Sequence, residues 1–99
     1  MKVRWTSQAA SDLREAHDYI AKNDDVATAQ KIIVKVLDAI SALPNHPKMG
    51  RRGRVKGTRE LIVSGTPFLV PYCIRKEHVA ILGVIHGRRR WPRRFETNG

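Results

Sequence analysis

The apolar run Val79–Ile85 constrains the fold most, and a cluster of positively charged residues follows it directly. A short, continuous run of aliphatic residues has the composition of a buried strand. The run ends at His86, and the segment Gly87–Arg90 then supplies three consecutive arginines. We therefore expect a core strand that carries an imidazole and several guanidinium groups to the rim of the domain.

Hydrophobic spacing in the rest of the chain predicts an α+β domain. Thr6-Ser7 and Asp24-Asp25 offer helix caps, and Pro44 stops the second helix. Short connections make the two helices a hairpin and the three later strands an antiparallel meander. The expected order is β-α-α-β-β-β, with an N-terminal helical hairpin packed on one face of a small antiparallel sheet and the other face partly open. The expected elements cover about residues 2–5, 7–23, 25–43, 58–63, 68–75 and 79–85.

Two features interrupt this pattern. Residues 45–57 are rich in proline, glycine and basic residues, which predicts a loop too polar to pack against the core. Pro71 lies inside an expected strand and has no amide N–H to donate to a neighbour. Its strand is therefore expected to lie at an edge of the sheet or to contain a bulge.

The 99 residues suffice for one domain over 1–99, with a flexible tail at about 93–99. Residues 1–47 are electrically balanced, whereas residues 48–99 hold thirteen basic and three acidic side chains and so the whole net charge of +10. Such asymmetry favours a polyanion or an acidic protein as the partner.

The chain carries one cysteine, Cys73, no apolar run long enough for a membrane span, and no signal-peptide pattern at its start. We therefore expect a cytoplasmic protein that does not bind membranes. Cys73, His78 and His86 lack the spacing of a metal site, and no phosphate-binding glycine motif is present. The sequence predicts neither a metal nor a cofactor.

His86 could move protons near neutral pH, or its ring could bond a neighbour and fix the end of the strand. Arg88 and Arg89 could bind phosphate, or form a solvated run of charge. Arg59 is a single arginine inside a strand, so it is a further candidate for phosphate stabilisation. It could also be the partner of Glu60 or Glu77.

Basic residues of the loop and tail are candidates for nucleic-acid binding. Trp91, set among arginines, suits base stacking or else packs on the edge of the domain. The full set predicted to contact nucleic acid is Lys48, Arg51, Arg52, Arg54, Lys56, Arg90, Trp91, Arg93 and Arg94.

The chain resembles the RelE/ParE superfamily of toxins from bacterial type II toxin–antitoxin modules. The resemblance covers nearly the whole chain and rests on the order of elements and on three segments, Gly57–Leu61, Pro71–Ile74 and Val84–Pro92. It implies a RelE/ParE-like fold, a growth-inhibiting toxin, and a hetero-oligomer with a cognate antitoxin whose flexible tail covers the basic face.

RelE-like members cut messenger RNA on the ribosome without a metal, by attack of a 2′-hydroxyl on the adjacent phosphate. By resemblance, Arg59 and Arg89 fall at phosphate-stabilising positions and His86 near an acid/base histidine, with Arg88 beside them. Phe95 falls near the place of a catalytic tyrosine and has no hydroxyl, which shifts proton transfer to His86. The resemblance therefore implies an endoribonuclease (mRNA interferase) whose partners are the ribosome and mRNA.

ParE-like members instead poison DNA gyrase without a nuclease site, and they too keep a histidine and an arginine after the last strand. His86 and Arg88 therefore fit both activities. A third alternative is a module that binds its antitoxin and is no longer toxic.

Overall fold

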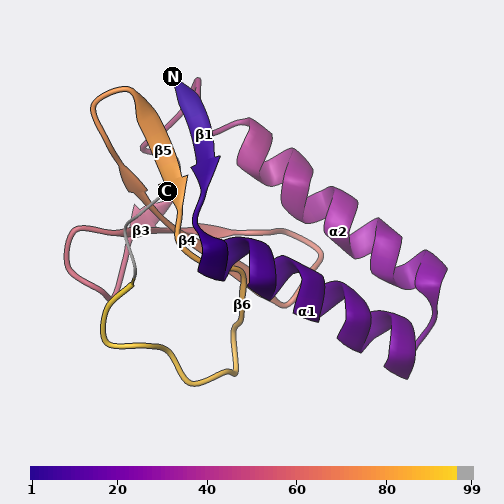
Figure 1. Ribbon diagram of the computed structural model, residues 1–99. Helices are drawn as coiled ribbons and strands as arrows, with labels where there is room; N and C mark the ends of the chain where they lie inside the picture. The colour runs from indigo at the N-terminus through magenta and orange to yellow at the C-terminus, as the bar shows by residue number, and fades with distance from the viewer. Residues whose placement is uncertain (96–99) are drawn as a thin grey trace.

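The computed structural model describes residues 1–95 as two helices packed on one face of a six-stranded sheet (Figure 1). The two helices run antiparallel as a hairpin, as expected from their short connection. Neither helix in this part of the chain is long and apolar enough to cross a membrane. The elements are β1 (Lys2–Trp5), α1 (Ser7–Asn23), α2 (Val26–Ser41), β2 (Arg51–Arg52), β3 (Arg59–Ile62), β4 (Phe68–Ile74), β5 (His78–Ile81) and β6 (Ile85–His86).

Both helices begin at the caps that the sequence predicts. The Thr6 hydroxyl accepts a hydrogen bond from the amide of Ala9 (3.1 Å) and donates one to the carbonyl of Ile81 (2.9 Å). The Asp25 carboxylate accepts from the amide of Thr28 (2.6 Å). Thr6 is fully buried, and its bond to Ile81 joins the start of α1 to the end of β5.

The strand order is β1-β5-β4-β3-β2, with β6 pairing β4 as well. Every neighbouring pair is antiparallel except β1 and β5, which run parallel with Lys2 opposite His78 and Trp5 opposite Ile81. The expected α+β class and the helical hairpin on the sheet are confirmed. The sheet is mixed, because the first strand enters it beside β5.

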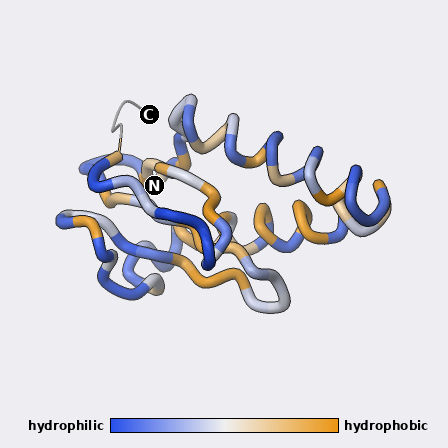
Figure 2. The backbone as a smooth tube through the Cα atoms, turned by 90° about the horizontal axis from the view of Figure 1, so that it is seen from below, coloured by the Kyte–Doolittle hydropathy of each residue, from blue (hydrophilic) through white to orange (hydrophobic). Residues whose placement is uncertain are grey.

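The main core lies between the helices and one face of the sheet, here called the helix face. Val70 and Tyr72 of β4 and Ile81 of β5 are fully buried against Val36 and Ile40 of α2. Figure 2 shows hydrophobic segments in the sheet and alternating hydrophobic and hydrophilic turns on the helices, which is the pattern of amphipathic helices on a core.

The opposite face of the sheet, here called the outer face, carries a second small core. Cys73, Ala80 and Leu82 are buried there, and Phe95 packs against them from the C-terminal segment. Phe95 falls within the tail expected at 93–99; residues 96–99 of that tail lie outside the described part of the chain. Phe95 therefore covers part of the face that the helices leave free.

The apolar run 79–85 forms two strands rather than one, because a β-bulge divides it. Tyr72 lies opposite Ile81 and Leu69 opposite Ile85, so three residues, 82–84, face two residues of β4. One of these two is Pro71, whose carbonyl accepts from the amide of Leu82 (2.9 Å). A bulge therefore lies beside Pro71, but its extra residue belongs to the run 79–85 and not to β4, the strand in which it was expected. The alternative of an edge strand is wrong, since β4 has neighbours on both sides.

The expectation that residues 45–57 do not pack against the core is wrong. Gly50 is buried, and residues 51–52 extend the sheet as β2. The buried hydroxyl of Tyr72 accepts from the amide of Gly50 (3.0 Å) and donates to the carbonyl of Pro47 (2.6 Å). The Tyr72 hydroxyl of the sheet therefore provides hydrogen-bond partners for two backbone groups of the loop. Burial raises the pKa of Tyr72, which keeps this hydroxyl a donor.

Candidate functional site

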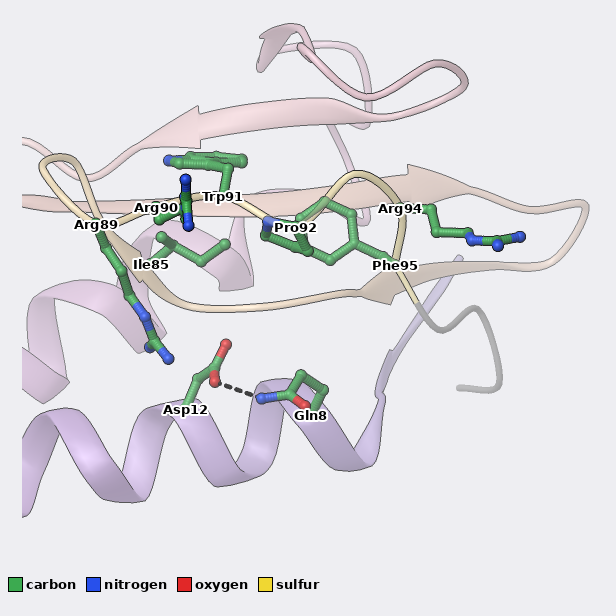
Figure 3. A pocket seen from close by; sticks show the side chains of 9 residues that line it. All are labelled: Gln8, Asp12, Ile85, Arg89, Arg90, Trp91, Pro92, Arg94 and Phe95. Carbon is green, nitrogen blue, oxygen red and sulfur yellow. Dashed lines mark hydrogen bonds between the residues drawn. The ribbon is translucent and has the colours of Figure 1, made fainter.

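A groove lies between α1 and the segment that follows the bulge, residues 84–95. It consists of two adjoining cavities of about 530 and 520 Å³, which share Asp12 and Arg89. The first cavity is drawn in Figure 3 and is lined by Gln8, Asp12, Ile85, Arg89, Arg90, Trp91, Pro92, Arg94 and Phe95. The second is lined by Asp12, Glu15, Ala16, Tyr19, Phe68, Val84, His86, Arg88 and Arg89.

Asp12 of α1 holds the bulge from which the groove is built. It is 5% exposed, and its carboxylate accepts from the amide of Val84 (3.1 Å) and from the side chain of Gln8 (2.8 Å). A side chain at position 83 would begin 3.1 Å from that carboxylate, which favours the glycine found there. Sequence reasoning missed Asp12, because a polar residue outside the apolar stripe of a helix is expected to face solvent. The signal was Gly83 inside an apolar run, since such a glycine marks a bulge or a close approach.

His86 lies exposed at the end of β6, on the wall of the second cavity. Its ring packs edge-on against Phe68, with centroids 5.8 Å apart. Its Nδ1 accepts from the backbone amide of Arg88 (3.1 Å). Since Nδ1 is an acceptor there, the neutral ring carries its proton on Nε2, which leaves Nε2 as its hydrogen-bond donor. This contact also fixes the end of the strand.

Arginines line the rim of the groove. Arg88 and Arg89 belong to the second cavity, opposite Glu15 and Tyr19 of α1. Figure 3 shows Arg89 extending toward α1 and Asp12, and Arg94 pointing away from the other labelled side chains. Within residues 1–95, none of these arginines forms an ion pair. No ion pair among the described residues therefore holds these arginines, although the carboxylates of Asp12 and Glu15 line the same cavities.

The structure brings His86, Arg88 and Arg89 together but leaves Arg59 apart. Arg59 lies opposite Tyr72 on one side of β4, whereas His86 lies opposite Phe68 on the other side. Four residues along a strand and two strand spacings separate their Cα atoms by about 16 Å.

Arg59 forms an ion pair with neither Glu60 nor Glu77, the two partners considered from the sequence. Its guanidinium instead donates to the carbonyls of Gly50 (2.7 Å) and Lys48 (3.3 Å). These bonds hold the loop over the end of the sheet, and they indicate a positioning role for Arg59 in the free protein.

Glu60 on the outer face compensates two of the arginines predicted to bind nucleic acid. Its carboxylate, 2% exposed, is bonded by Arg51 (3.0 Å) and by the side chain and amide of Arg54 (3.1 and 2.8 Å). Burial by itself raises the pKa of Glu60, but these hydrogen bonds outweigh it, and the pKa lies below its ordinary value.

Arg54 also stacks on Trp91, with its guanidinium carbon 3.7 Å from the centre of the ring. Trp91 in turn packs edge-on against Phe95, with ring centroids 6.3 Å apart. One face of the indole is therefore covered by Arg54 and not free for a base. Trp91 packs on the edge of the domain, the second of the two roles considered from the sequence.

The remaining predicted contacts are exposed. Lys48, Arg52, Lys56 and Arg93 carry no ion pair within the described residues. In the same part of the chain, no group of three histidine, cysteine or acidic side chains could hold a metal ion.

Residues 3–91 match the family described as "ParE toxin of type II toxin-antitoxin system, parDE". The chain belongs to the ParE toxin family. A curated relative from Sinorhizobium fredii (strain NBRC 101917 / NGR234), named "Putative toxin Y4kP", is 40% identical over 91 residues, which cover 92% of this chain and 93% of the relative. The resemblance to the RelE/ParE superfamily is thereby confirmed.

A solved structure agrees with this assignment, and a second shares the fold. A chain of the "Chromosomal ParDE TA system from P. aeruginosa" has a TM-score of 0.82 and 25% identity to this ParE-family chain, covering 87% of it and 95% of the matched chain. The YoeB dimer from Staphylococcus aureus has a TM-score of 0.56 at 13% identity, with 84% and 92% covered, and shares the fold.

Proposed function

We propose that this ParE-family chain is a toxin that a cognate antitoxin neutralises, and that the free toxin inhibits growth by binding DNA gyrase. The observation that carries the choice over mRNA cleavage is the hydrogen bond from the amide of Arg88 to Nδ1 of His86. It supports a histidine that binds rather than one that transfers protons.

Cleavage of RNA by its own 2′-hydroxyl needs a proton acceptor, a proton donor and a cationic stabiliser. His86 has its Nδ1 occupied and its Nε2 protonated, so the neutral ring offers no free acceptor. Arg59 lies about 16 Å away, and Phe95 lacks a hydroxyl. Among the residues 1–95 that line the groove, Glu15 on the opposite wall is the only exposed carboxylate. A cleavage mechanism built from these residues would need Glu15 as its proton acceptor.

The groove has the composition of a protein-binding surface. Its walls combine apolar residues such as Phe68 and Ile85 with arginines and with Tyr19, whose side chain is 69% exposed. Tyrosine and arginine are the residues that most often dominate binding energy in protein interfaces. We infer that His86, Arg88 and Tyr19 contact the target.

The antitoxin is proposed from family membership and from charge. The second half of the chain carries the whole net charge of +10, which favours an acidic, flexible partner that orders on binding. Gyrase and its DNA are cytoplasmic, so the toxin is proposed to act there. Growth arrest on expression without the antitoxin would exclude a module that has lost its toxicity.

Two assays with the purified toxin separate the candidate activities. Supercoiling by gyrase is expected to be inhibited, while a defined message translated on purified ribosomes is expected to stay intact. Cleaved message with unaffected supercoiling would overturn the proposal in favour of an mRNA interferase.

Variants sharpen this comparison. Arg88→Ala is expected to weaken gyrase inhibition, whereas Arg14→Ala, an exposed arginine of α1 outside the groove, is expected to leave it unchanged. Glu15→Gln is expected to retain toxicity, because no proton transfer is required of it. Loss of toxicity in Glu15→Gln together with loss of message cleavage would establish the nuclease.

A further inference from the structure

We propose that a basic pocket on the β2–β3 hairpin binds a phosphate group of a nucleic-acid backbone, apart from the groove and whatever protein the groove binds. The pocket has a volume of about 460 Å³. It is lined by Arg52, Gly53, Lys56, Gly57, Thr58, Arg59 and Ile74. None of the lining residues is acidic.

Strand pairing sorts the arginines of this hairpin onto two faces. Arg51 lies opposite Glu60, and Arg52 lies opposite Arg59. Because successive side chains of a strand point to opposite faces, the Arg51–Glu60 pair occupies the outer face and the Arg52–Arg59 pair the helix face. The outer face therefore holds a compensated cluster, and the helix face holds two arginines without a carboxylate.

Two like charges directly opposite each other on a sheet destabilise it. Within residues 1–95, neither Arg52, Arg59 nor Lys56 forms an ion pair that would offset the repulsion. An anion seated between them would offset it. Arginine and lysine are the side chains that bind phosphate best, by forked hydrogen bonds and by point charge.

The end of the hairpin is held in shape by its own hydrogen bonds. The amide of Gly53 donates to the carbonyl of Thr58 (2.8 Å), and the Thr58 hydroxyl donates to the carbonyl of Val55 (2.6 Å). Gly57 turns the chain at φ +82°, a conformation that other residues rarely adopt. The guanidinium of Arg59 is fixed by the carbonyl of Gly50. The site is therefore largely formed before a ligand arrives.

The lining favours a nucleic-acid backbone over an acidic protein. Ile74 is its only large apolar residue and it contains no aromatic side chain, whereas protein interfaces depend on such anchors. Exposed Arg75 and Lys76 follow Ile74 directly and extend the positive charge at this end of the sheet. Contacts between basic side chains and phosphates give nucleic-acid binding that depends on the salt concentration and not on the base sequence.

Fluorescence anisotropy of the purified toxin with a labelled DNA duplex and a labelled single-stranded RNA tests the proposal. The test variant is the double substitution Arg52→Gln/Lys56→Gln. The matched control is Lys22→Gln/Lys31→Gln, which removes the same charge from the helices. Both variants are first checked for cooperative thermal unfolding, which shows that they are folded.

The pocket variant is expected to bind more weakly, with the slope of log affinity against log salt reduced by about one for duplex DNA, since the pocket holds one phosphate and each phosphate contact contributes about 0.9. The control is expected to change far less. A stronger effect on the duplex identifies DNA as the source of the phosphate, and a stronger effect on the single strand identifies RNA. Equal binding by the pocket variant and the native protein, or loss of binding only to a purified antitoxin, would overturn the proposal.

Discussion

Replacement of Asp12 by alanine tests whether this carboxylate holds the bulge before His86. The substitution removes the acceptor for the amide of Val84, which is 2% exposed. A buried N–H without a partner costs about 1–3 kcal/mol, and a bond to an ionised acceptor lies toward the upper end. The bond from Gln8 adds little, because that side chain is exposed and can turn to water. We expect a loss of about 2–3 kcal/mol of unfolding free energy.

For a domain of this size, about 1 kcal/mol corresponds to about 4–8 °C in Tm, so Asp12→Ala is expected to lower the Tm by about 10–20 °C. Thermal unfolding followed by circular dichroism measures this shift. Asp18→Ala on the same helix is the control, since its side chain is 82% exposed and pairs with the neighbouring His17. The control is expected to change stability by less than about 0.5 kcal/mol.

Hydrogen exchange at the amide of Val84 gives a second, local readout. The amide is expected to be protected in the native protein and to exchange faster in Asp12→Ala than in Asp18→Ala. Equal Tm values for the two variants, or unchanged protection at Val84, would show that the bulge does not depend on Asp12.

Three further predictions concern the loop and the outer face. Because the pKa of Glu60 is lowered in the folded protein, its ionised carboxylate stabilises the native state above pH 4.5, and this stabilisation is lost as the pH falls below 4.5. Glu60→Gln is therefore expected to make the free energy of unfolding depend less on pH in this range, which urea titrations at several pH values would detect. Tyr72→Phe leaves the amide of Gly50 without its partner and is expected to cost about 1–3 kcal/mol in the same titrations, whereas an unchanged midpoint would show that the loop does not need the hydroxyl. Arg54→Ala uncovers Trp91 and is expected to shift its fluorescence to longer wavelength in a Trp5→Phe background; an unshifted spectrum would contradict the stacking.

Local patterns allowed the main elements to be predicted from the sequence. Hydrophobic spacing and the caps at Thr6 and Asp25 depend on neighbouring residues, and both helices begin where these signals indicate. His86, Arg88 and Arg89 cluster as expected, because they are adjacent in the chain. Pro71 predicted a bulge at this point of the sheet, because it has no N–H to donate, although the extra residue lies in the neighbouring run 79–85 and not in β4.

Long-range contacts account for what could not be predicted. A polar residue such as Asp12 appears solvent-facing on a helix until the bulge brings the amide of Val84 against it. The packing of the loop depends on the Tyr72 hydroxyl from a distant strand. The separation of Arg59 from His86 follows from strand order and register, which a single sequence does not specify.

The parallel pairing of β1 with β5 affects the order of events during synthesis of the chain. Lys2–Trp5 cannot form its hydrogen bonds until His78–Ile81 has left the ribosome, and the buried Thr6 waits for Ile81 in the same way. Contacts between distant parts of a chain form late. The fold therefore remains incomplete until almost all of the chain has been translated, and a truncated product without the last strands would leave β1 and the start of α1 without their partners.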